Sequence, residues 1–158
     1  NTIYRPGRQG IYIVSKGESF SRANRIINNI IVASDSKWYD KSAYIMVFDA
    51  YHLKTLVAPG TWFDNVFKNN LFYHASSGEN DMVLYNFKTG SQTWSLADLQ
   101  KLFPATFAGN IDADPLFADP AKGVFSLKSG SPAKGAGIDA GFPSDGKSPD
   151  LGAGMPAP

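Results

Sequence analysis

The sequence of 158 residues contains no cysteine and has no long apolar stretch. Without cysteine the chain cannot form disulfides, thiolate metal sites or a cysteine nucleophile. Every apolar run is shorter than the roughly 18 residues that a membrane-spanning helix needs, and no signal peptide is visible. We therefore expect no membrane as a partner of this sequence.

Charge is also scarce. Charged residues make up 18% of the chain and leave a formal net charge of +1. No dense Lys/Arg run is present, so the electrostatic footprint of a nucleic-acid binder is missing and we expect no nucleic acid as partner. Hydrophobic residues account for 43% and aromatic residues for 13%, which fits one folded domain rich in strands or carrying a sugar-facing surface.

Two segments place an asparagine pair between similar apolar flanks. They are NRIINNIIVAS (24–34) and NVFKNNLFYHAS (65–76), and they lie 41 residues apart. Apolar strand candidates lie at equivalent positions around them, at residues 10–17, 44–50 and 81–87. A last, degenerate copy of the Asn-containing segment follows at residues 110–120. The order strand, loop, Asn-containing strand therefore recurs along the chain.

Such a repeat predicts stacked β-coils. Repeats of about 20 to 50 residues that are rich in β-branched and aromatic residues are typical of solenoids, and the short alternating apolar runs argue against helical repeats. Asparagine tolerates left-handed geometry at a bend, and its amide can bond to the backbone or to the asparagine of the next coil. Asn28-Asn29 and Asn69-Asn70 should mark the same corner of successive coils, unless they are two unrelated Asn-rich turns.

The last third of the chain contains a helix and a change of composition. SLADLQKLF (95–103) predicts a short amphipathic helix, which its serine can cap and which Pro104 ends. From residue 143 onward Pro, Gly, Ser and Asp predominate, as in a closing loop. We expect a single domain over residues 1–153 and a tail over residues 154–158.

The stretch GNIDADPLFADPAKGVFSLKSGSPAKGAG (109–137), followed by DLGA (150–153), resembles the last coils of secreted bacterial right-handed parallel β-helix proteins of the pectate-lyase-like superfamily. The resemblance is strong over the last third of the chain and loose before it. It implies an all-β, right-handed parallel β-helix of about three to four coils with one short flanking helix. It also implies a secreted, cell-surface or periplasmic location.

Several motifs of this ending have structural roles. In the DPLF motif, Leu116 and Phe117 are expected to point into the core, and Asp150 to tie the final loop to the body. Proteins with this ending usually have many more coils before it. We therefore expect that the chain is the C-terminal piece of a longer protein, or that a partner chain or a homo-oligomer covers its N-terminal end.

The resemblance also implies a function on polysaccharides. Superfamily members include lyases, hydrolases, epimerases and noncatalytic glycan binders, so the fold does not select the reaction. We expect a polysaccharide lyase or glycoside hydrolase, or its C-terminal part. A glycan-binding or adhesive module and a structural segment that stacks on a partner are the alternatives.

The best catalytic cluster is FDAYHLK (48–54), which contains Asp49, His52 and Lys54. Asp49 could act as an acid or a metal ligand, His52 as a base or hydrogen-bond donor, and Lys54 as a base. A turn aspartate with solvated neighbours is the alternative. The two histidines lack zinc-ligand spacing. The resemblance leaves Ca²⁺ as the candidate cofactor, and the sequence names no ligand set for it.

Aromatic and basic loop residues form a second kind of candidate site. Trp38, Tyr39 and Lys41 lie together in a loop between strands, and Trp62 lies in another loop. Exposed aromatic rings can stack on sugars, and Arg25 could bind an anionic sugar if it faces a cleft. Trp38 could instead fold back as a loop anchor, and Arg25 could be a solvated strand end.

Overall fold

The computed structural model describes residues 1–6, 9–33, 46–58, 60–74, 83–87, 90–141 and 147–152. In chain order its elements are β1 (Thr2–Tyr4), β2 (Ile11–Gly17), β3 (Arg25–Ile27), β4 (Ile30–Val32), β5 (Met46–Leu53), β6 (Val66–Lys68), β7 (Leu71–Tyr73), β8 (Val83–Phe87), β9 (Gly90–Trp94), α1 (Leu96–Leu102), α2 (Pro104–Phe107), β10 (Ile111–Asp112), β11 (Phe117–Asp119), η1 (Pro120–Lys122) and β12 (Val124–Leu127).

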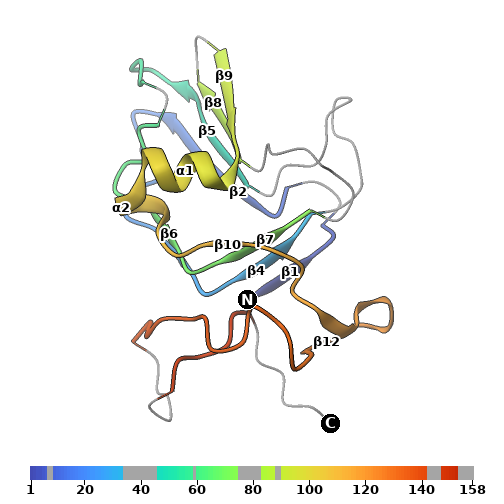
Figure 1. Cartoon of the computed structure of the whole chain (residues 1–158). Coiled ribbons are helices and arrows are strands. Elements are labelled where there is room, and N and C mark those ends of the chain that lie inside the picture. Colours follow the sequence, from blue (N-terminus) through green and yellow to red (C-terminus); the bar gives the residue numbers. More distant parts are fainter. Residues whose placement is uncertain are drawn as a thin grey trace.

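Parallel pairing between successive groups of strands organises most of the chain (Figure 1). One sheet has the order β1-β4-β7-β10, and all its neighbours are parallel. A second sheet pairs β2, β5 and β8 in parallel and ends with β9, which returns antiparallel along β8. β3 and β6 form a small parallel pair. Each strand of one group thus lies beside its counterpart in the next.

The predicted equivalence of the two Asn-containing segments is confirmed. Ile26 pairs with Phe67 and Ile30 with Leu71, in parallel register. Ile111 takes the next place beside Leu71, so the segment that begins at residue 110 also starts as a copy. The repeat in the sequence therefore corresponds to repeated parallel strand pairing in the structure.

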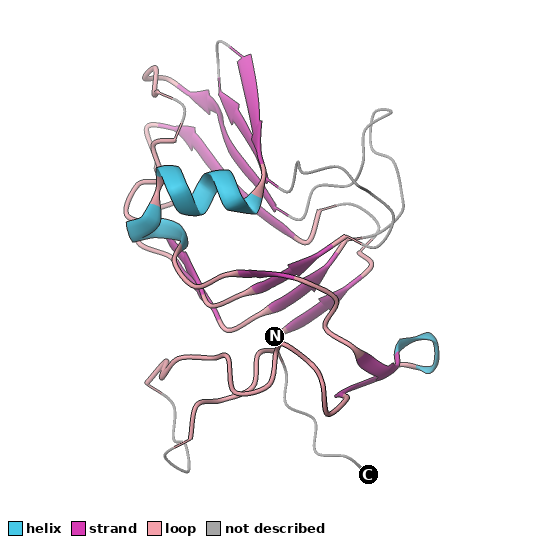
Figure 2. Cartoon of the chain, in the orientation of Figure 1, coloured by secondary structure: helices cyan, strands magenta, loops and turns pink. Residues whose placement is uncertain are grey.

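The predicted all-β, right-handed parallel β-helix with one flanking helix is wrong. Among the described residues the structure is mixed, with small parallel and antiparallel sheets and several helical segments (Figure 2). Two antiparallel pairs, β8-β9 and β11-β12, interrupt the parallel pattern. Many of the strands have only three residues.

Local sequence explains why there are two α-helices rather than one. The Ser95 hydroxyl accepts the backbone N–H of Asp98 at 3.1 Å and so caps α1. Pro104 ends α1, but it also occupies the first turn of α2, where its missing N–H costs no hydrogen bond. The ring of Phe107 then stacks on Phe67 of β6 at 4.9 Å, which anchors α2 to the strands.

A ladder of side-chain hydrogen bonds joins the corners of successive groups of strands, and its members, which we call the inner asparagines, are Asn1, Asn29, Asn70 and Asn110. The Nδ2 group of each donates to Oδ1 of the next: Asn1 to Asn29 at 3.0 Å, Asn29 to Asn70 at 2.9 Å, and Asn70 to Asn110 at 3.0 Å. Asn29, Asn70 and Asn110 are buried. The ladder satisfies amides that burial would otherwise leave unpaired.

The outer asparagine of each pair has a different role. Asn28 and Asn69 adopt left-handed φ angles of 58° and 49°, which confirms the predicted bend. Asn28 Nδ2 donates to the carbonyl of Ile138 at 2.6 Å, and Asn69 Nδ2 donates to that of Ala136 at 3.1 Å. The pair thus combines an inner ladder residue with an outer residue that holds the C-terminal segment.

The buried apolar residues form two clusters. The interior between the sheets includes Phe48, Phe72 and Leu99, whereas Phe117 and Leu151 pack on the opposite face of the β1-β4-β7-β10 sheet. Within the described ranges no helix is long and apolar enough to span a membrane.

The ending motifs are only partly as predicted. Phe117 is buried, but Leu116 is 36% exposed, so its expected place in the core is wrong. Asp150 Oδ1 accepts the backbone N–H of Gly135 at 2.8 Å, which confirms that it ties the final loop to the body. The predicted tail, residues 154–158, lies outside the described residues.

β1, β2 and β3 lie at the edges of their sheets in the described part of the chain. Edge strands of this kind can pair with further strands. The expectation that missing coils, a partner chain or a homo-oligomer covers this end stays a prediction.

Candidate functional site

The face of β2 and β5 that points away from the interior carries most of the predicted catalytic residues. Along β2, Ile13 and Ser15 are buried, whereas Tyr12, Val14 and Lys16 are exposed. Val14 is in register with Asp49, and Lys16 with His52. We define the outer β2-β5 face by Tyr12, Val14, Lys16, Asp49, Tyr51 and His52.

Asp49 is a buried carboxylate on this face, with 4% of its surface exposed. The hydroxyl of Tyr12 donates to Asp49 Oδ2, and the backbone N–H of Tyr51 donates to Oδ1 at 2.8 Å. Both carboxylate oxygens therefore accept a hydrogen bond from within the chain. Asp49 thus holds the hydroxyl of Tyr12 and the backbone of Tyr51 rather than presenting a bare carboxylate.

The contact with Asp49 should be visible in a tyrosine titration. Burial of the phenol, then the hydrogen bond and the charge of Asp49, raise the pKa of Tyr12 to about 12. Because the folded pKa is raised, the stabilisation from this pair is present below pH of about 10 and is lost as pH rises through about 12. Burial and Asp114 raise the pKa of Tyr73 as well, so absorbance titration should show late-titrating tyrosines, one of which disappears in Tyr12→Phe. An unchanged titration curve in the variant would contradict the contact.

His52 and Lys54 are exposed. The rings of Tyr51 and His52 meet edge to face at 5.2 Å. Lys54 Nζ lies 3.0 Å from Glu18 Oε1 in an ion pair whose members are both exposed. The structure therefore brings Asp49 and His52 to one face, while Lys54, the proposed base, is paired with Glu18 beyond the end of the strand.

Of the predicted sugar-binding residues, Trp62 is placed differently from expectation. Its side chain is 5% exposed, and its indole packs against Phe48, Phe107 and Trp94. A buried ring cannot offer a face to a sugar, so Trp62 belongs to the core. Trp38, Tyr39 and Lys41 lie outside the described residues.

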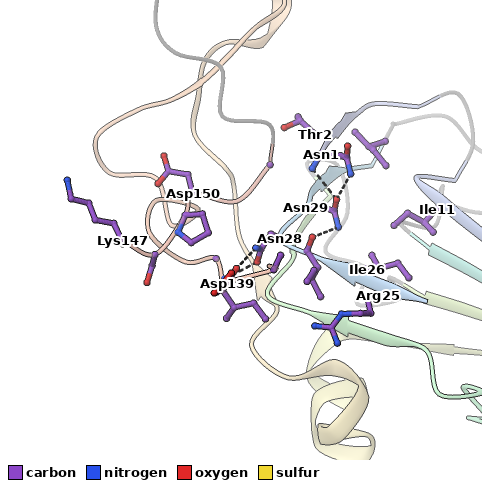
Figure 3. Close-up of a pocket in the computed structure, with 18 residues that line it drawn as sticks. Asn1, Thr2, Ile11, Arg25, Ile26, Asn28, Asn29, Asp139, Lys147 and Asp150 are labelled. Atoms are coloured by element: carbon purple, nitrogen blue, oxygen red, sulfur yellow. Dashed lines mark hydrogen bonds between the residues drawn. The ribbon is translucent and has the colours of Figure 1, made fainter. Parts of the chain in front are cut away.

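Arg25 lines a cavity of about 1510 Å³ (Figure 3). The cavity lies between the edges of β1 and β3 and the C-terminal segment. Figure 3 shows Arg25 on the strand side and Lys147 on the opposite loop. Asp139 and Asp150 also line it, but each already accepts a backbone N–H, Asp139 from Gly141 at 2.7 Å and Asp150 from Gly135 at 2.8 Å.

The described residues contain no group of three or more His, Asp or Glu side chains that could hold a metal ion. Oxygen ligands from several side chains are what a Ca²⁺ site needs. Ca²⁺ therefore stays a prediction of the resemblance.

Sequence reasoning missed Tyr12 and Tyr51 as site residues. Tyr12 is 50% and Tyr51 49% exposed, and both donate to Asp49, Tyr12 through its hydroxyl and Tyr51 through its backbone N–H. The alternation Ile-Tyr-Ile-Val-Ser in β2 contains the signal, because buried and exposed positions alternate along a strand.

Comparison with known proteins assigns no family, because no family model, curated protein or solved structure matches the chain. The resemblance to the pectate-lyase-like superfamily therefore rests on the ending motifs alone.

Proposed function

We propose that the chain binds polysaccharide on the outer β2-β5 face. The observation that carries this proposal is a pair of half-exposed tyrosines next to the buried Asp49 carboxylate, which accepts the hydroxyl of Tyr12 and the backbone N–H of Tyr51. A tyrosine ring offers an apolar surface to the C–H groups of a sugar, and its hydroxyl can bond to sugar hydroxyls. Lys16 and His52 add polar groups to the same face.

Binding has more support than catalysis. Glycoside hydrolysis uses two carboxyl groups about 5 to 9.5 Å apart, and Asp49 is the one carboxylate that we place on this face among the described residues. The raised pKa keeps the Tyr12 phenol protonated at neutral pH, so it is a poor base. Lys54, the other candidate base, is held in an ion pair with Glu18.

Affinity electrophoresis against a panel of uronic-acid and neutral polysaccharides tests the proposal. We expect retention by at least one polysaccharide, and we expect Tyr51→Ala to weaken it about tenfold, since an aromatic contact contributes about 1 kcal/mol or more. Leu56→Ala is the matched control, because Leu56 is 66% exposed but lies outside the face. No retention by any polysaccharide, or equal effects of the two substitutions, would overturn it. New reducing ends or absorbance from unsaturated products would instead show cleavage.

A further inference from the structure

The ladder of inner asparagines has a direction. Oδ1 of Asn70 accepts both the backbone N–H and the Nδ2 group of Asn29, at 3.1 and 2.9 Å. Oδ1 of Asn110 accepts the same two groups of Asn70, at 2.9 and 3.0 Å. Oδ1 of Asn29 accepts the backbone nitrogen and Nδ2 of Asn1, at 3.1 and 3.0 Å. Every contact therefore runs from two donors in one group of strands to one acceptor in the next group along the chain.

The end of the ladder at Asn110 is closed by the helices. The backbone N–H of Asn110 donates to Oε1 of Gln100 at 3.0 Å, so a side chain of α1 accepts the bond that a further asparagine would accept. The Nδ2 group of Asn110 donates to the carbonyl of Phe107 at 2.7 Å. Leu99 of α1 and Phe107 of α2 are fully buried in the interior. The two helices therefore satisfy the last donors of the ladder and bury apolar residues at this end.

The end of the ladder at Asn1 is open. Asn1 is exposed, and in the part of the chain that the structure describes no donor reaches its Oδ1 atom. β1 is an edge strand, which offers backbone N–H and C=O groups to a further strand. Ile3, Ile11 and Ile26, one from each of the edge strands β1, β2 and β3, pack against the interior and also line the cavity of about 1510 Å³. Figure 3 shows Asn1, Ile11 and Ile26 on the strand side of this cavity.

The direction of the ladder decides what can cover the open end. Asn1 presents an acceptor there, because its backbone nitrogen and its Nδ2 group both donate to Asn29. A second copy that met this end head to head would place acceptor against acceptor, and a copy that met it with its Asn110 end would present α1 and α2 instead of a strand. A partner that continues the pattern has to supply two donors, the backbone N–H and the side-chain amide of an asparagine.

We propose that the edge of β1 binds an extended segment of a partner protein in which an asparagine is followed two residues later by an apolar residue. The segment lies parallel to β1, its asparagine donates to Asn1 Oδ1, and its apolar side chain covers Ile3. The chain contains a template for this contact, because NIIV (29–32) lies on NLFY (70–73) in this way. The inference goes beyond the proposed function and does not depend on it, since no residue of the outer β2-β5 face lines this cavity.

Titration of the ¹⁵N-labelled chain with the peptide acetyl-NIIVAS-amide, which copies residues 29–34, tests this edge. We expect shifts of the β1 amides and of the Asn1 side-chain amide, with a dissociation constant on the order of 1 mM, because a short flexible peptide has to be ordered on binding. The peptide acetyl-DIIVAS-amide keeps the size and the backbone N–H but lacks the amide donor, and it should bind about tenfold more weakly. Equal binding of the two peptides, or no shifts on β1, would overturn the inference.

Asn1→Ala supplies the residue-level test, with Asn24→Ala as matched control. Both asparagines are exposed, and each donates to Oδ1 of a buried asparagine, Asn29 or Asn65, but Asn24 precedes β3 and not β1. We expect Asn1→Ala to weaken binding of acetyl-NIIVAS-amide about tenfold and Asn24→Ala to leave it unchanged. Equal effects of the two substitutions would contradict a site at Asn1.

Sedimentation velocity of the chain without peptide distinguishes a partner protein from a second copy. We expect one monomeric species at the concentrations of the titration, because the direction of the ladder opposes contact between two like ends. A dimer that shifts the β1 amides and is lost in Asn1→Ala would assign this edge to a second copy and overturn the proposal.

Discussion

Replacing Asn70 by alanine is expected to lower the free energy of unfolding by about 3–5 kcal/mol. The Asn70 side chain is fully buried, and its Oδ1 accepts the N–H of Asn29 at 3.1 Å and Nδ2 of Asn29 at 2.9 Å. Its own Nδ2 donates to the carbonyl of Ile26 at 2.9 Å and to Asn110 at 3.0 Å. Truncation would leave several of these groups buried with fewer partners, and each unsatisfied group costs about 1–3 kcal/mol.

Asn24→Ala is the matched control for this prediction. Asn24 makes the same kind of contact, with its N–H and Nδ2 donating to Asn65 Oδ1 at 2.9 and 2.7 Å, but Asn24 itself is exposed. Water can replace part of what is lost there, so we expect a cost below about 1 kcal/mol. Urea unfolding of both variants measures the difference. Equal midpoints for Asn70→Ala and Asn24→Ala would show that the inner ladder does not stabilise the fold.

Trp62→Ala is expected to destabilise the chain by about 3–5 kcal/mol, the usual range for loss of a large buried aromatic residue. The indole packs edge to face on Phe48 at 5.4 Å and on Phe107 at 4.9 Å, and lies 5.8 Å from Trp94. These partners come from β5, α2 and β9, so the indole joins elements from distant parts of the chain. Its removal would open a cavity where these elements meet.

Thermal unfolding combined with polysaccharide retention tests the role of Trp62. Trp62→Ala should lower the melting temperature strongly, while the fraction that stays folded should retain polysaccharide as the unsubstituted chain does. Trp62→Phe keeps much of the apolar volume and should cost clearly less. A Trp62→Ala variant with an unchanged melting temperature and lost retention would instead support the original hypothesis of a sugar platform.

Parallel pairing could be predicted because the asparagine pairs repeat with their flanks. A buried amide at a bend needs a partner, and the equivalent amide of the neighbouring group provides it, so the repeat carried structural information at Asn29 and Asn70. The fold class could not be predicted in the same way. Pro104 reads equally well as the end of one helix and as the start of another, and the antiparallel return of β9 depends on partners far from the repeat.

The site was predictable only in part, because its contacts cross between strands. Asp49 was found because it lies in a charged cluster next to an apolar run. Its partner Tyr12 lies 37 residues away in sequence, and only the register of β2 and β5 brings them together. Trp62 was misplaced because composition cannot distinguish an aromatic residue on a loop surface from one that folds into the core; its position depends on distant rings such as Phe107.

The most direct test of polysaccharide binding on the outer β2-β5 face is an amide chemical-shift titration with the polysaccharide that is retained most strongly. We predict that the largest shifts fall on residues 11–17 of β2 and 46–53 of β5, which surround Tyr12, Asp49 and Tyr51. Shifts confined to other strands, or none with any polysaccharide in the panel, would contradict the proposal.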